Sequence, residues 1–122
     1  MKILLVDDDP VIGAILSDYL AAHGHKLEVM TSGKEAIEQI NHGTQSPDIL
    51  LLDLVMPDMN GIDVLQKLKA DHKTESLPVI LLSANADSDE LLEGYEHKAD
   101  HYLSKPFNIK RIIDLISEVG PK

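Results

Sequence analysis

The sequence predicts a doubly wound α/β fold in which helices cover both faces of a five-stranded parallel sheet. Short apolar runs alternate along the chain with segments whose apolar residues recur at helical spacing. The apolar runs are continuous, as in parallel strands that are buried on both faces. The 122 residues contain no linker and no internal repeat, and we expect a single domain over residues 1–122.

Five apolar runs predict the strands, and five amphipathic segments predict the helices. The predicted strands cover residues 3–6, 27–31, 49–52, 78–82 and 102–104, and the last of them has the weakest pattern. The apolar faces of the predicted helices span residues 12–19, 36–40, 62–68, 91–95 and 109–116.

The first predicted helix has clear signals at both ends. The carboxylate of Asp9 is suited to cap the helix, and Pro10 suits the first helical position. Gly24 marks the end of the helix. Its apolar face repeats at helical spacing through Ile12, Ile15, Leu16 and Tyr19.

The composition excludes several classes of function. Without cysteine, the chain has no disulfide framework, thiolate metal site or cysteine nucleophile. The longest uninterrupted apolar stretches are four residues long, which predicts no membrane partner, and we expect a cytoplasmic domain. The net charge of −10, from 11 basic and 21 acidic residues, argues against direct binding of nucleic acid by this domain.

Polar residues follow the predicted strands at the point where each apolar run stops. Asp7, Asp8 and Asp9 follow the first strand and Asp53 the third, while Ser83 follows the fourth and Lys105 the fifth. Ligands of open parallel sheets bind beyond the carboxyl ends of the strands, at the topological switch point. In the flavodoxin-like strand order 2-1-3-4-5, the first and third strands are neighbours, roughly 4.8 Å apart. We therefore expect the acids of these two strands to converge.

Converging carboxylates repel one another unless one is protonated or a cation lies among them. Several acids with water suit Mg²⁺, which takes oxygen ligands. Lys105 adds a positive charge, and Ser83 adds a hydroxyl group. The combination predicts a site for a phosphoryl group.

Four segments of the chain carry a resemblance to a known family. Together they resemble the response-regulator receiver domain of two-component signalling, in order and spacing, over essentially the whole chain. The segments are ILLVDDDP at 3–10, LLDLVMPDMNG at 51–61, PVILLSA at 78–84 and YLSKPF at 102–107.

The resemblance implies that Asp53 is the phospho-acceptor, attacking a phosphohistidine of a sensor histidine kinase or histidine phosphotransfer protein. Asp8, Asp53 and the backbone carbonyl of Val55 would hold Mg²⁺ directly, and Asp7 would act through water. Lys105 and Ser83 would contact phosphoryl oxygens. Such a domain catalyses only its own phosphorylation and dephosphorylation, so we expect no enzyme with a separate substrate.

The resemblance also implies a switch. On phosphorylation Ser83 would move toward the phosphate and Tyr102 would turn inward, which changes the face of the fourth helix, fifth strand and fifth helix. That face would act on a downstream output domain or target protein, and homodimerisation on phosphorylation is a further hypothesis. The sequence leaves open whether the domain stands alone or belongs to a longer regulator.

Three other classes of protein fit parts of the sequence, and one position departs from the receiver pattern. Residues 7–11 fit the D-x-D-x-V opening of haloacid dehalogenases, but no further acidic pair follows Lys105 on a strand of its own. A flavodoxin would need a hydroxyl- and glycine-rich loop after the first strand, and a receiver-like module that is never phosphorylated would not need the complete acid set.

Lys98 stands where the family often carries glycine, which puts the end of the fourth helix in doubt. The six histidines are predicted to be surface residues: His23, His25, His42, His72, His97 and His101.

Overall fold

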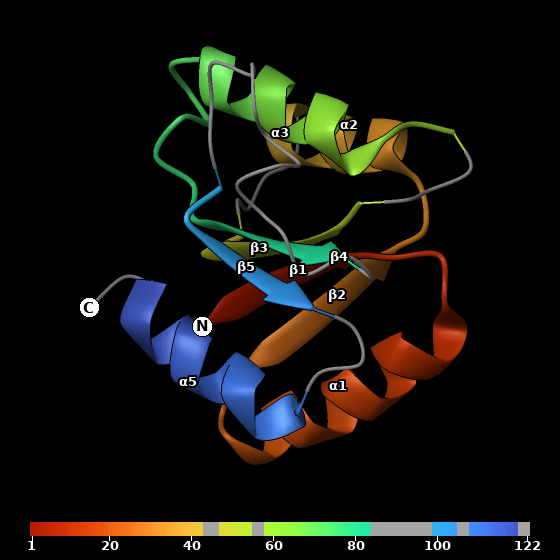
Figure 1. Ribbon diagram of the computed structural model, residues 1–122, viewed down its shortest axis with the longest axis vertical. Coiled ribbons are helices and arrows are strands. Elements are labelled where there is room, and N and C mark those ends of the chain that lie inside the picture. Colours follow the sequence, from red (N-terminus) through yellow and green to blue (C-terminus); the bar gives the residue numbers. More distant parts are fainter. Residues whose placement is uncertain (43–46, 55–57, 84–98, 105–107, 120–122) are drawn as a thin grey trace.

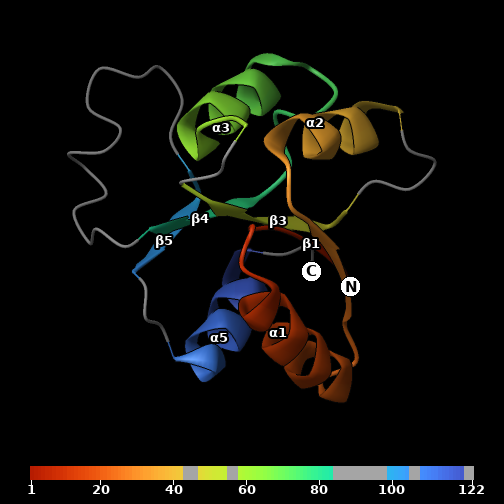
Figure 2. The same ribbon diagram turned by 90° about the vertical axis from the view of Figure 1, so that its right-hand side faces the viewer.

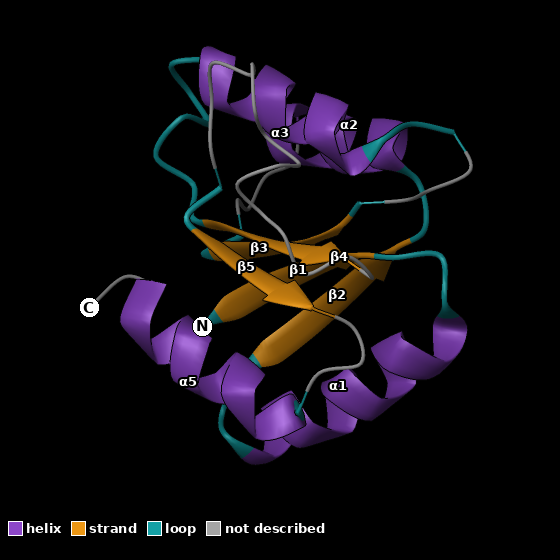
Figure 3. Ribbon diagram, in the orientation of Figure 1, coloured by secondary structure: helices purple, strands orange, loops and turns teal. Residues whose placement is uncertain are grey.

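The computed structural model describes residues 1–42, 47–54, 58–83, 99–104 and 108–119. A five-stranded parallel sheet in the order β2-β1-β3-β4-β5 forms its centre, which confirms the predicted order (Figures 1 and 3). The strands are β1 (Lys2–Val6), β2 (Lys26–Met30), β3 (Ile49–Asp53), β4 (Val79–Ser83) and β5 (His101–Ser104). The helices are α1 (Pro10–Ala22), α2 (Gly33–His42), α3 (Gly61–Ala70) and α5 (Ile109–Val119). The predicted fourth helix lies outside the described residues.

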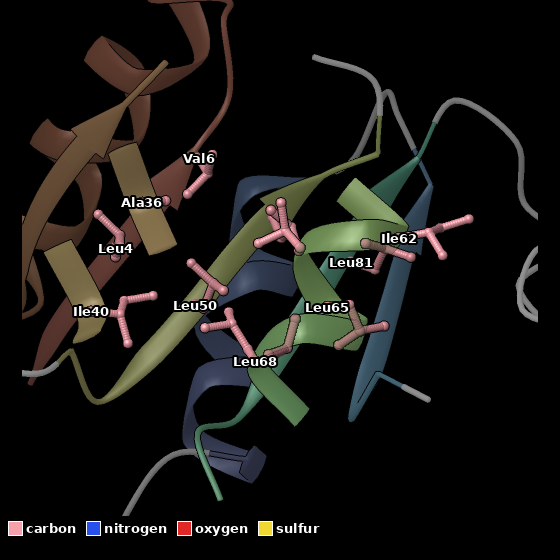
Figure 4. Packing of buried hydrophobic residues seen from close by; sticks show 12 residues of the cluster. Leu4, Val6, Ala36, Ile40, Leu50, Ile62, Leu65, Leu68 and Leu81 are labelled. Atoms are coloured by element: carbon pink, nitrogen blue, oxygen red, sulfur yellow. The ribbon is translucent and has the colours of Figure 1, made fainter. Parts of the chain in front are cut away.

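Helices cover both faces of the sheet. Figure 2 shows α2 and α3 on one face and α1 and α5 on the other. Successive strand residues alternate between the two layers. Leu4 and Leu50 pack toward α2 and α3 (Figure 4), while Leu5 and Leu51 pack toward α1 and α5. All four side chains are essentially inaccessible to solvent, as expected for the continuous apolar runs. No helix in the described ranges has the length and apolarity needed to cross a membrane.

The ends of α1 confirm the sequence prediction, but its apolar face differs from it. Asp9 Oδ1 accepts the backbone N–H of Val11 at 2.9 Å, and Gly24 follows the helix with a φ of 82°. The prediction was wrong for Ile15, which is 48% exposed. Gly13 is instead among the buried residues of the helix and faces the sheet, where an added Cβ would lie 3.2 Å from Val29 Cγ2.

Lys69 and Asp100 join three elements at the end of the sheet where the strands begin. Lys69 Nζ donates to the carbonyl oxygens of Leu77 (2.8 Å) and Glu75 (3.3 Å) and to Asp100 Oδ2 (3.0 Å). The same Asp100 oxygen accepts the N–H of Val79 at 2.7 Å. The ammonium group therefore ties α3 to the starts of β4 and β5.

Substituting Lys69→Met is expected to lower the free energy of unfolding by about 1–3 kcal/mol, because three acceptors lose a charged donor. Urea denaturation measures the effect. Lys67→Met is the matched control, because Lys67 is exposed on the same helix and its loss should cost no more than about 0.5 kcal/mol. Equal effects of the two substitutions would show that the network contributes nothing.

Candidate functional site

Three carboxylates meet at the carboxyl ends of β1 and β3. Val6 pairs with Leu52 in the parallel register, so Asp7 and Asp8 leave β1 where Asp53 ends β3. One oxygen from each of Asp7, Asp8 and Asp53 lies within 4.8 Å of the others. Asp7 and Asp53 are buried, with 1% and 7% of their surface accessible, whereas Asp8 faces the solvent. The structure thus brings together the three acids that the strand ends predicted.

The backbone around the acids is held by hydrogen bonds. The N–H of Asp7 donates to the carbonyl of Met30 at 3.0 Å, and Asp7 Oδ1 accepts the N–H of Asp9 at 2.9 Å. The carboxylate of Asp9 turns away to cap α1, which explains why this third consecutive aspartate does not join the cluster. On the other strand, the N–H of Leu54 donates to the carbonyl of Leu82 at 2.9 Å.

The start of α3 is packed directly on the backbone of Asp53. The N–H of Gly61 donates to the carbonyl of Leu54 at 2.8 Å, and Asn60 caps the helix by accepting the N–H of Ile62 at 2.8 Å. A Cβ on Gly61 would lie 2.2 Å from the carbonyl oxygen of Asp53. The sequence marks Asn60 and Gly61 only as a turn, whereas the structure requires glycine for this close approach.

Asp58 was missed by the sequence analysis. Its Oδ2 accepts the Ser32 hydroxyl at 2.8 Å and the Lys34 N–H at 3.2 Å, and its Oδ1 accepts the Gly33 N–H at 3.2 Å. These bonds, led by the one from Ser32 and then the one from Lys34, lower the pKa of the Asp58 carboxyl. The partners lie some 24 to 26 residues apart in sequence, and no local pattern indicates the contact.

The remaining predicted site residues fall partly within the described structure. Ser83 ends β4 beside β3, where Asp53 pairs with Leu82, and it is 6% exposed. Tyr102 of β5 is half-buried and packs against the cluster under α2 and α3. Lys105 and Val55 lie outside the described residues. The roles of these four residues therefore stay predictions.

The acid cluster fits a hard divalent cation. Three carboxylates supply the oxygen donors that Mg²⁺ prefers, and the open side at Asp8 leaves room for water ligands. Within the described ranges it is the only group of three histidine or acidic side chains close enough to share an ion.

The histidines match the prediction in part. The exposed histidines are His23, His42 and His72. His25 and His101 are partly buried, and His97 lies outside the described residues. Burial, helped by the nearby N-terminal ammonium, lowers the pKa of His25. Its Nδ1 lies 3.1 Å from that amine.

The fold and the site define a class: an open parallel α/β domain with three converging carboxylates, suited to a divalent cation, at its topological switch point. A sequence profile described as the response regulator receiver domain matches residues 3–117. The chain belongs to this family, whose members are the phospho-accepting domains of two-component systems.

Curated relatives agree with this assignment. The chain is 39% identical over 118 residues to the transcriptional regulatory protein CpxR of Escherichia coli, covering 97% of this chain and 48% of that protein. It is 38% identical over 112 residues to the DNA-binding response regulator MtrA of Mycolicibacterium smegmatis, covering 92% and 47%. The chain thus spans about half the length of these relatives.

Solved structures are similar over nearly the full chain. The receiver domain of the Francisella response regulator 1452 superposes with a TM-score of 0.84 at 33% identity, over 97% of this chain and 94% of that one. The receiver domain of a Pseudomonas aeruginosa sensor histidine kinase superposes with a TM-score of 0.83 at 25% identity, over 97% and 95%. That structure is described with a magnesium ion coordinated in its active-site cleft.

Proposed function

We propose that Asp53 accepts a phosphoryl group from a phosphohistidine of a sensor histidine kinase or histidine phosphotransfer protein. The observation that carries the proposal is the convergence of Asp7, Asp8 and Asp53 within 4.8 Å. Asp8, Asp53 and the carbonyl of Val55 would hold Mg²⁺, with Asp7 acting through water. The magnesium ion in the Pseudomonas aeruginosa relative supports this assignment.

The reaction is an in-line displacement at phosphorus. An oxygen of Asp53 forms the new P–O bond while the P–N bond to the partner's imidazole breaks. The nitrogen keeps the electron pair, and the ring leaves as neutral imidazole because its other nitrogen carries a proton. Bound Mg²⁺ supplies positive charge that offsets the clustered carboxylates and the phosphoryl oxygens.

Residues on neighbouring strand ends would recognise the transferred group. Ser83, at the end of β4, would donate its hydroxyl to one phosphoryl oxygen, and Lys105 would pair with another. These bonds exist only in the phosphorylated state, and they therefore shift the domain toward a second conformation. Tyr102 on β5 would report the change at the face that includes β5 and α5, where an output domain, a target or a second copy would bind.

The chemistry is self-directed: the domain catalyses gain and loss of its own phosphoryl group and transforms no separate substrate. We expect it to act in the cytoplasm, where an ATP-dependent kinase forms phosphohistidine. CpxR and MtrA are described as a transcriptional regulator and a DNA-binding regulator. A DNA-binding output joined to this receiver is therefore one hypothesis, and a receiver that signals by binding alone is the other.

Incubation with acetyl phosphate and Mg²⁺ tests the proposal, with intact mass spectrometry as the readout. We expect wild type to gain the mass of one phosphoryl group, and the gain to vanish with EDTA or in Asp53→Asn. Asp63→Asn is the matched control, because Asp63 is an exposed acid on α3 and its loss should leave the labelling unchanged.

A wild-type chain that gains no phosphoryl group has two explanations, rapid hydrolysis or an inert site. Beryllofluoride, which mimics a phosphorylated carboxylate, separates them because it does not require a stable covalent product. Failure to bind beryllofluoride in the presence of Mg²⁺ would overturn the assignment of Asp53 as acceptor.

A further inference from the structure

The carboxylate of Asp58 completes the N-terminus of α2 from a different part of the chain. Ser32 caps the helix: its hydroxyl oxygen accepts the N–H of Glu35 at 3.3 Å, and its carbonyl accepts the N–H of Ala36 at 3.1 Å. The N–H groups of the two preceding residues, Gly33 and Lys34, donate to Oδ1 and Oδ2 of Asp58, each at 3.2 Å. Two donors of the first turn are thereby satisfied by a residue that follows β3.

The hydrogen bonds to Asp58 are stronger than bonds between neutral groups, because their acceptor is a charged carboxylate. A carboxylate that accepts two backbone N–H groups and a hydroxyl at a helix N-terminus also interacts favourably with the helix dipole. The lowered pKa of the Asp58 carboxyl agrees with this geometry, because the three bonds favour its ionised form. We call this contact of Asp58 with Ser32, Gly33 and Lys34 the α2 latch.

The latch lies on the segment that begins at the proposed acceptor. Asp58 is five residues from Asp53, and the segment is fixed at Leu54, which donates to Leu82 and accepts from Gly61. The chain is therefore held at both described ends of this short stretch, at Leu54 by β4 and α3 and at Asp58 by α2. Because only five residues of chain separate Asp58 from Asp53, a displacement of Asp58 relative to α2 is transmitted toward the acceptor.

We propose that Asp58 is a positioning residue: the α2 latch fixes the chain five residues beyond Asp53 and so sets the affinity of the acid cluster for Mg²⁺. The inference rests on the proposed function, because it assumes that the cluster binds this ion. Coupling is reciprocal, so Mg²⁺ bound at the cluster also tightens the latch. The N–H groups of Gly33 and Lys34 then exchange with solvent more slowly.

Calorimetric titration of the chain with Mg²⁺ tests the proposal. We expect Asp58→Ala to weaken Mg²⁺ binding about tenfold, at the low end of the range for residues that hold metal ligands from outside the coordination sphere. Asp58→Asn should weaken it less, because the amide keeps one acceptor oxygen. This milder variant keeps the test valid if Asp58→Ala folds poorly.

Asp48→Ala is the matched control. Asp48 Oδ2 also accepts a backbone N–H, that of Lys2 at 2.7 Å, but at the opposite end of the sheet. It should lower stability without changing the dissociation constant for Mg²⁺. Amide hydrogen exchange, followed by NMR, is a second measurement. Adding Mg²⁺ to wild type should slow exchange at Gly33 and Lys34, and adding it to Asp58→Ala should leave their exchange unchanged.

The outcomes separate the two claims. Wild-type affinity and wild-type protection in both Asp58 variants would overturn the latch as a positioning device while leaving the acceptor site intact. An equal loss of affinity in Asp48→Ala would also overturn it, because general destabilisation would then explain the effect. A wild-type chain that binds no Mg²⁺ would overturn the proposed function together with the inference.

Discussion

Replacement of Gly61 by alanine is expected to lower the free energy of unfolding by about 3 kcal/mol and to impair phosphorylation of Asp53. The new Cβ would lie 2.2 Å from the carbonyl oxygen of Asp53 and 2.9 Å from Leu54 Cα. Both are backbone atoms at the end of the central strand, and Leu54 is bonded to Leu82 of β4. Neither atom can yield without displacing the acceptor or breaking the sheet. Urea denaturation and acetyl phosphate labelling measure the two effects.

Gly13→Ala provides the comparison. It also introduces a methyl group into a helix, but the nearest atom is Cγ2 of the Val29 side chain at 3.2 Å, which can rotate away. Alanine favours the helix by about 1 kcal/mol over glycine, so the net change should be small. If Gly61→Ala were as mild as Gly13→Ala, the close packing of α3 on Asp53 would not exist in solution.

Asp8→Asn is expected to abolish the stabilisation of the domain by Mg²⁺. An ion that binds only the folded chain stabilises it by about 2.7 kcal/mol at a concentration 100 times its dissociation constant. Asp8 is exposed, so the substitution leaves the core untouched while it removes one of the two carboxylates proposed to bind the ion directly. In the absence of Mg²⁺ the variant should be more stable than wild type by about 1 kcal/mol, because one repulsive charge is gone.

Thermal unfolding with and without Mg²⁺ measures how far the ion stabilises Asp8→Asn and wild type. Asp9→Asn is the control. Asp9 is the next residue, but its carboxylate caps α1, and asparagine caps a helix equally well. This variant should keep the wild-type response to Mg²⁺. A wild-type response in Asp8→Asn, or its loss in Asp9→Asn, would contradict the assignment of the ligands.

Much of the fold and of the acid cluster could be predicted from the sequence. The apolar runs that end at Val6, Leu52 and Leu82 are continuous and short, which favours strands buried on both faces. Once strands of this kind are parallel, the polar residue after each must lie at one edge of the sheet. The convergence of Asp7 and Asp53 thus follows from two local patterns and one rule of topology.

The rest depends on tertiary contacts that no local pattern encodes. Ile15 has the spacing of a core residue but is exposed, whereas Gly13, which has no side chain, lies on the buried face of α1. The glycine at position 61 is explained only by the path of β3 beneath it, and the bond from Ser32 to Asp58 joins residues 26 apart. Each requires knowledge of how two elements pack, which the periodicity of either element alone does not contain.

The most direct test of the central claim is to locate the phosphoryl group chemically. Borohydride reduces an aspartyl phosphate to homoserine and releases phosphate, and peptide mass spectrometry then identifies the residue. After incubation with acetyl phosphate and Mg²⁺, the account predicts homoserine at position 53, and none when Mg²⁺ is removed by EDTA. Homoserine at position 7 or 8, or labelling that persists without Mg²⁺, would contradict it.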